Sequence, residues 1–145
     1  MANYYGYTRT NYFRVTDEEK YSELFSHLVG DDDYIEDFTK TKDGIILHGF
    51  GCQGVIQAIP MDEDPEVAEE WNDDFDGFLK ELQKILPDNE AFILTVVGHE
   101  KLCYLVGYSI VVTGNNIKSI DINEGAIELA RTMLSDETFT TEMDY

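Results

Sequence analysis

The segment from Pro60 to Phe78 constrains this chain more than any other stretch. It contains nine carboxylates and no lysine or arginine. Neighbouring carboxylates repel one another, so a chain gains no stability by concentrating them. We therefore expect an acidic connector over residues 60–74 that either stays solvated or binds a positively charged surface. Its acidic side chains, with those just after it, are Asp62, Glu63, Asp64, Glu66, Glu69, Glu70, Asp73, Asp74 and Asp76.

The whole chain is strongly acidic. Its 145 residues include 30 acidic and 10 basic side chains, for a formal net charge of -20. Such a field repels nucleic-acid phosphates and anionic membranes and attracts basic protein surfaces. We therefore expect no direct binding to nucleic acid or membranes. Because 43% of the residues are hydrophobic and 12% are aromatic, the chain has enough apolar side chains for one folded domain over residues 1–145.

The sequence also indicates a cellular compartment. No apolar run approaches the roughly 20 residues of a transmembrane helix, and the first residues do not resemble a signal peptide. The two cysteines, Cys52 and Cys103, form no C-x-x-C pair. We expect a cytoplasmic protein with both thiols reduced.

The first quarter of the chain predicts a strand followed by a helix. Residues 3–15 are rich in aromatic and β-branched side chains, which favours a strand. Thr16 and Glu19 have the spacing of a capping box, which predicts a helix over 17–29 that ends at Gly30. We expect the tyrosines of the strand to pack in the core or at an edge of a sheet. They are Tyr4, Tyr5, Tyr7 and Tyr12.

The rest of the chain predicts two groups of strands separated by a helix. Asp43-Gly44 lies between alternating runs at 34–39 and 45–50, which is a strong hairpin signal. The other expected elements are strands at 54–59, 91–97, 102–112 and 117–122, helices at 74–86 and after Asn123, and a loose tail at 136–145. The order β-α-β-β-β-α-β-β-β-α predicts an α+β domain, with a mostly antiparallel sheet of five to seven strands and helices on one face.

Residues 49–54 match the G-x-G-x-x-G pattern of dinucleotide-binding loops. In that fold the glycines open a helix, whereas here Val55 to Ile59 continues as a strand. The anionic surroundings also disfavour phosphate. We therefore interpret these glycines as a bulge or a tight turn that requires positive φ.

Two His–Cys pairs have the same spacing, His48 with Cys52 and His99 with Cys103. A site with two cysteines and two histidines would require each pair to lie close together. Strand residues four apart are separated by about 13 Å, so the chain would have to turn between them. We expect no metal, cofactor or catalytic residue, while a small Cys/His metal protein stays as an alternative.

Three segments carry a resemblance to known proteins: Asn3–Glu19, Lys42–Gly51 and Gly98–Tyr108. They resemble a family of small acidic proteins carried by conjugative elements and phages of Gram-positive bacteria. The genetic setting, size and charge are similar to those of anti-CRISPR and anti-restriction proteins. The resemblance implies inhibition by occupying a DNA site, and it brings no catalytic residues with it.

Charge and resemblance together predict a non-enzymatic inhibitor that mimics DNA. It would occupy the basic groove of a CRISPR effector or restriction nuclease in the bacterial host. Trp71 could anchor the interface, since exposed tryptophans dominate interfaces, or it could belong to the core. An acidic regulatory module that binds a basic protein of a mobile element is the alternative, and a homodimer through the N-terminal aromatic residues is open. The expected contacts are Asp31, Asp32, Asp33, Glu36, Asp37, Asp62, Glu63, Asp64, Glu66, Glu69, Glu70, Trp71, Asp73, Asp74 and Asp76.

Overall fold

The computed structural model describes residues 4–30, 34–67, 72–100 and 104–139. Three helices and ten strands lie in these ranges. The helices are α1 (Glu18–Ser26), α2 (Phe75–Gln83) and α3 (Ile122–Leu134). The strands are β1 (Tyr4–Thr10), β2 (Leu28–Gly30), β3 (Glu36–Asp37), β4 (Lys40–Lys42), β5 (Ile45–Leu47), β6 (Phe50–Gln53), β7 (Ile56–Ala58), β8 (Phe92–Glu100), β9 (Tyr104–Val112) and β10 (Ile117–Asp121).

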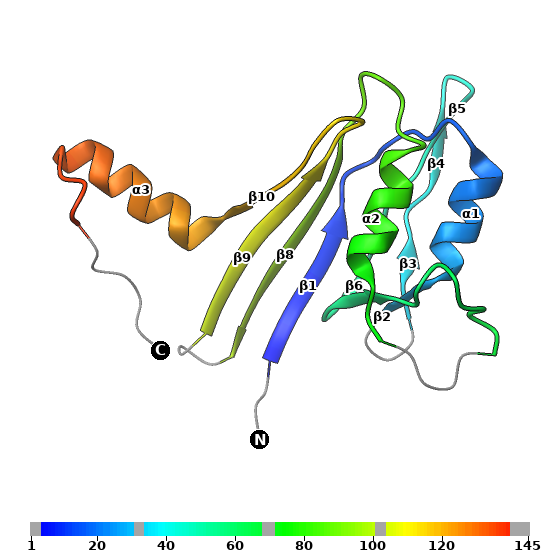
Figure 1. The fold of residues 1–145 in the computed structure, drawn as a ribbon, viewed down its shortest axis with the longest axis horizontal. Coiled ribbons are helices and arrows are strands. Elements are labelled where there is room, and N and C mark those ends of the chain that lie inside the picture. Colours follow the sequence, from blue (N-terminus) through cyan, green and yellow to red (C-terminus); the bar gives the residue numbers. More distant parts are fainter. Residues whose placement is uncertain (1–3, 31–33, 68–71, 101–103, 140–145) are drawn as a thin grey trace.

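Six strands form the main sheet, in the order β10-β9-β8-β1-β6-β3. Every neighbouring pair in it is antiparallel. Two small sheets, β2-β7 and β4-β5, complete the strand pairing of the described residues (Figure 1). This arrangement confirms the α+β fold with a mostly antiparallel sheet.

Helices α1 and α2 pack on one face of the sheet and bury an aromatic core. The ring of Phe13 meets that of Phe92 edge to face, with 5.0 Å between centroids, and Phe50 and Phe78 are also fully buried. The buried side of β8 follows from its alternation, because Phe92, Leu94 and Val96 are buried while Val97 is exposed.

The helix boundaries differ from the sequence expectation in all three helices. Helix α2 ends at Gln83 instead of residue 86, and α3 begins at Ile122, capped by Asp121, instead of after Asn123. Helix α1 differs at both ends. Asp17, not Thr16, caps α1, because the Asp17 side chain accepts a hydrogen bond from the Lys20 N–H at 3.0 Å. The predicted capping box is therefore wrong. The helix also stops at Ser26, because residues 28–30 pair with β7 as strand β2 and leave Gly30 outside the helix.

The turn predicted at Asp43-Gly44 is confirmed, whereas of the three glycines at 49–54 only Gly54 has the positive φ expected of them. Asp43 and Gly44 both have positive φ, 54° and 79°, as the two-residue turn between β4 and β5 requires. Gly54 has a φ of 85°. A Cβ on Gly51 would lie 2.6 Å from the carbonyl oxygen of Thr8, so the close pairing of β6 with β1 requires glycine there.

The opposite face of the sheet is open. Tyr5 and Tyr7 are 63% and 57% exposed, so the expectation that they pack in the core is wrong. Because side chains alternate along a strand, burying Thr8 and Thr10 of β1 on the helix side places these tyrosines on the other side. Helix α3 runs outward from the β10 edge (Figure 1), and none of its residues is buried. Within the described ranges, no helix has the length and apolar character needed to cross a membrane.

Candidate partner-binding site

The acidic connector between β7 and α2 is tied to the domain at both ends through Ala58. The Ala58 N–H donates to the Asp73 carboxylate at 2.9 Å, and the Asp74 N–H donates to the Ala58 carbonyl at 2.9 Å. The Ile59 N–H bonds the carbonyl of His27 at the end of α1. The connector therefore leaves the fold and returns to it at one point beside the C-terminal end of α1.

Local turns shape the connector between these ties. The Glu66 N–H donates to the Asp64 side chain at 2.9 Å, and the Glu63 N–H donates to the Pro60 carbonyl at 3.0 Å. Met61 is half-buried and packs against the core. The carboxylates therefore point outward from a short loop that Met61 holds on the domain. In the described part of the connector before its closing tie at Asp73, the exposed acids are Asp62, Glu63, Asp64 and Glu66.

The acids at the end of the connector have structural roles. Asp73 fixes Ala58, as described above, and Asp74 caps α2 by accepting a hydrogen bond from the Gly77 N–H at 3.2 Å. Asp76 is exposed in the first turn of α2, where the helix dipole favours a negative charge. Sequence alone does not separate these acids from the outward-facing ones.

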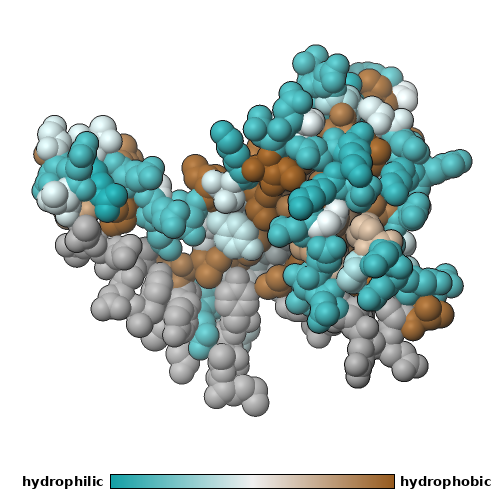
Figure 2. Space-filling view, viewed as in Figure 1, coloured by the Kyte–Doolittle hydropathy of each residue, from teal (hydrophilic) through white to brown (hydrophobic). Residues whose placement is uncertain are grey.

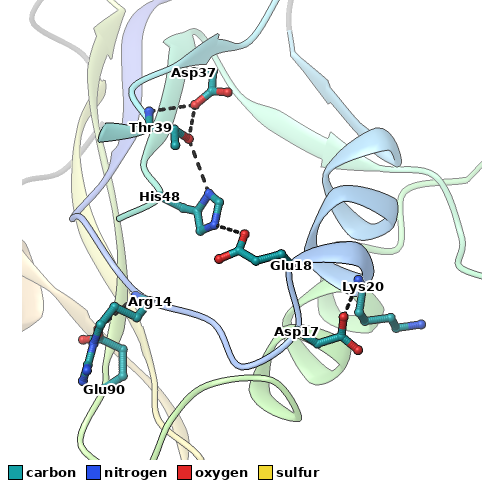
Figure 3. Close-up of polar contacts among 8 residues, drawn as sticks. All are labelled: Arg14, Asp17, Glu18, Lys20, Asp37, Thr39, His48 and Glu90. Atoms are coloured by element: carbon teal, nitrogen blue, oxygen red, sulfur yellow. Dashed lines mark hydrogen bonds and ion pairs between the residues drawn. The ribbon is translucent and has the colours of Figure 1, made fainter. Parts of the chain in front are cut away.

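Two of the expected contact acids, Glu36 and Asp37, lie outside the connector, on the edge strand β3. Both are exposed, and Asp37 accepts hydrogen bonds from the backbone and the hydroxyl of Thr39. The Thr39 hydroxyl lies 3.4 Å from His48 Nδ1, and His48 Nε2 lies 2.6 Å from Glu18 on α1 (Figure 3). This chain of polar groups links the edge of the sheet to the start of α1.

Tyr21 packs beside this polar chain, with its ring centroid 4.1 Å from that of His48. Burial raises the pKa of the Tyr21 hydroxyl, and the nearby carboxylates of Asp37 and Glu18 raise it further. Because the hydroxyl stays neutral, the site keeps its negative charge on the two carboxylates alone.

The ion pairs of the described residues lie elsewhere. Glu81 pairs with Lys84 at 2.9 Å and with Lys20 at 4.0 Å, and Arg14 pairs with Glu90 at 3.2 Å. Across residues 4–30, 34–67, 72–100 and 104–139, no ion pair reaches any of the expected contact acids. Those described acids are Glu36, Asp37, Asp62, Glu63, Asp64, Glu66, Asp73, Asp74 and Asp76.

Helix α1 adds to the negative potential at the connector. Its C-terminal carbonyls carry partial negative charge, and its last turn contains no basic residue. The tie between Ile59 and His27 brings the start of the connector to this helix end. A cation that binds the connector would therefore also meet the negative end of α1.

The remaining expected contacts fall outside the described residues. They are Asp31, Asp32, Asp33, Glu69, Glu70 and Trp71.

The structure reveals a groove that sequence reasoning missed. It lies on the open face of the sheet and has a volume of about 990 Å³. The alternation of side chains along β1 and β8 could have predicted this groove, because large apolar side chains in both strands alternate with buried ones. We call it the back-face groove. Its lining residues are Tyr5, Tyr7, Val97, Gly98, His99, Leu105 and Val106.

A second hollow adjoins the groove at Tyr7, with a volume of about 650 Å³. Arg9 lies there with its guanidinium 4.4 Å from the ring centroid of Phe38, and Glu36 lines the same hollow. Glu36 of β3 therefore borders a hollow that already contains an arginine.

The two His–Cys pairs do not meet. His48 pairs with Phe13, whereas His99 pairs with Tyr5 at the other end of β1. Their partners Phe13 and Tyr5 are eight residues apart, or about 25 Å along an extended chain. Cys103 is outside the described residues. His48 and His99 therefore cannot share one metal ion.

Comparisons of the chain with protein-family models, with curated proteins and with solved structures gave no match.

Proposed function

We propose that this protein is a non-enzymatic inhibitor of a DNA-targeting defence complex in a bacterial host. Its acidic connector would occupy the basic groove in which a CRISPR effector or a restriction nuclease binds DNA. The observation that carries the proposal is the set of exposed connector acids without an ion pair among the described residues, in a chain of net charge -20.

The physical basis is electrostatic competition. A DNA-binding groove gains affinity by pairing its lysines and arginines with phosphates, which are spaced about 1.7 Å apart along the duplex axis. Asp62, Glu63 and Asp64 place three carboxylates on consecutive residues, whose Cα atoms lie about 3.8 Å apart, which gives the connector a high local density of negative charge. No lysine or arginine of the described residues forms an ion pair with these carboxylates, so they are open to the basic side chains of such a groove. Each such contact would exclude a DNA phosphate from the same place.

The connector is also suited to this role by its anchoring. Asp73 and Asp74 close the loop on Ala58, and Met61 packs on the core. A loop that is already held in place loses less conformational entropy on binding than a free acidic tail. The connector therefore presents its charges at a low ordering cost.

The test compares two variants that remove the same number of charges. The connector variant is Asp62→Asn, Glu63→Gln, Asp64→Asn and Glu66→Gln. The control variant changes four exposed acids outside the proposed site: Asp43→Asn, Asp88→Asn, Glu128→Gln and Glu137→Gln.

The assay is cleavage of target DNA by purified CRISPR effectors and restriction nucleases, with the inhibitor added before or after the DNA. We expect inhibition only when the inhibitor is added first, at least a tenfold loss of inhibition in the connector variant, and less than a threefold loss in the control. Equal loss in both variants would attribute the effect to net charge and reject the connector as the contact.

A further inference from the structure

We propose that two copies of this chain form a symmetric dimer in which α3 of each copy lies in the back-face groove of the other. The groove and the helix are both apolar, both exposed, and carried by the same chain. This inference does not depend on the proposed function, because neither surface contains any of the expected contact acids.

Helix α3 presents an apolar stripe whose large side chains are exposed in the part of the chain that the structure describes. Ile122, Ala126, Leu129 and Met133 recur at intervals of four, three and four residues, which places them along one side of a helix. Ile122 is 66% exposed, Leu129 60% and Met133 77%. Figure 2 shows α3 standing apart from the main body, with hydrophobic side chains at its surface.

The stripe and the groove adjoin each other. A Cβ on Gly107 would lie 2.8 Å from Cγ2 of Ile122, so the first residue of the stripe rests on β9 at Gly107. Gly107 pairs with Val97, which lines the groove. The stripe therefore begins on the open face of the sheet and continues away from it as one apolar surface.

The connection between β10 and α3 prevents the helix from folding back over its own groove. β10 ends at Asp121 and α3 begins at Ile122, with no residue between them. The Asp121 side chain caps the helix through the N–H groups of Asn123 and Glu124. The Asn123 side chain also bonds the Leu105 carbonyl at 3.2 Å. These contacts fix the direction of the helix, so its stripe stays exposed among the described residues and is open to a second molecule.

The exposed area is sufficient for a stable dimer. A specific interface buries about 800 Å² of each partner. The large exposed side chains of the stripe, the groove and the strand between them together expose on the order of 1,000 Å² per copy, and so large an apolar patch is unusual for a monomer. They are Tyr5 (63%), Tyr7 (57%), Val97 (47%), Leu105 (41%), Ile120 (63%), Ile122 (66%), Leu129 (60%) and Met133 (77%).

Charge does not oppose the approach of a second copy at this surface. None of the described residues that line the groove carries a carboxylate, and Glu124 and Glu128 lie on the side of α3 opposite the stripe. Two copies of a chain with net charge -20 repel one another, and this apolar face is where they can approach without bringing carboxylates together. The connectors, on the helix-covered side, stay exposed in such a dimer.

The test uses one variant on each surface and a matched control. Met133→Glu places a charge on the stripe, Val97→Lys places one in the groove, and Thr132→Glu places the same charge as the first variant on a different side of α3. We expect wild type and Thr132→Glu to have twice the chain mass of 16.6 kDa in light scattering, and each of the other two variants to have the monomer mass. Thermal unfolding would show that both monomers remain folded.

Mixing the two monomeric variants gives the decisive result. A mixed dimer contains one Val97→Lys chain and one Met133→Glu chain. In its first contact, the unchanged helix of the Val97→Lys chain lies in the unchanged groove of the Met133→Glu chain. In its second contact, the introduced glutamate faces the introduced lysine. We therefore expect the mixture to recover the dimer mass, with at least a tenfold lower Kd than either variant alone. A mixture that stays monomeric would overturn the proposal, as would a monomeric wild type, because helix-to-helix or groove-to-groove dimers give no such rescue.

Discussion

The glycines at 49–54 yield a prediction that separates close strand packing from nucleotide binding. A methyl group on Gly51 would lie 2.6 Å from the Thr8 carbonyl oxygen, which is backbone and cannot rotate away. Gly54 has a φ of 85°, where a side chain is strained. At Gly49 the nearest atom is in the Tyr12 side chain, 3.3 Å away, and that ring can shift.

The expected costs follow from these distances. Gly51→Ala should lower the free energy of unfolding by about 1–3 kcal/mol, as overpacking does. Gly54→Ala should lower it by about 1–2 kcal/mol, and Gly49→Ala by less than about 1 kcal/mol. For a chain of this size, each kcal/mol corresponds to roughly 3–4 °C in Tm.

Urea unfolding monitored by circular dichroism measures this series, and Gly125→Ala is the control. Gly125 lies inside α3 with no atom within 4 Å of an added Cβ, so alanine there should raise stability by about 0.5–1 kcal/mol. If Gly51→Ala unfolds at the same urea concentration as wild type, or if Gly49→Ala is the most damaging of the three, our explanation of this glycine motif is wrong.

Two further predictions concern Tyr21 and the acids around α2. Because the pKa of Tyr21 is raised above its ordinary value of 10.0, the unfolded chain loses this proton first, and stability that is complete below pH 10 falls as the pH rises. In urea titrations above pH 10, Tyr21→Phe should reduce this fall in the free energy of unfolding by up to about 1.4 kcal/mol per pH unit. Asp74→Ala should cost about 1 kcal/mol through the lost helix cap, while the connector variant should stay within about 0.5 kcal/mol of wild type. A connector variant that unfolds as readily as Asp74→Ala would show that these acids are structural.

Local signals in the sequence predicted the local structure. The turn at Asp43 and Gly44 is set by two neighbouring residues that tolerate positive φ, and the apolar spacing before Pro87 predicted α2. Strand β2 could not be predicted in this way. Its three residues become a strand only by pairing with β7, some 28 residues later in the chain, and no local pattern specifies that pairing.

The same limit applies to the candidate site. Composition predicted an acidic connector, but whether each carboxylate binds within the chain depends on where Ala58 and Gly77 lie in the fold. Periodicity likewise predicted an amphipathic helix after Asn123 but could not say what covers its apolar side. The exposure of Tyr5 and Tyr7 depends on α1 and α2 both packing on the opposite face of the sheet.

The salt dependence of binding tests the central claim most directly. With a purified CRISPR effector or restriction nuclease that the protein inhibits, Kd would be measured by calorimetry from 50 to 200 mM salt. If the connector replaces DNA phosphates, removing its four charges should reduce the slope of log K against log salt by about three to four, and the control variant should retain the wild-type slope. A connector variant that binds with the wild-type affinity and slope would contradict the account.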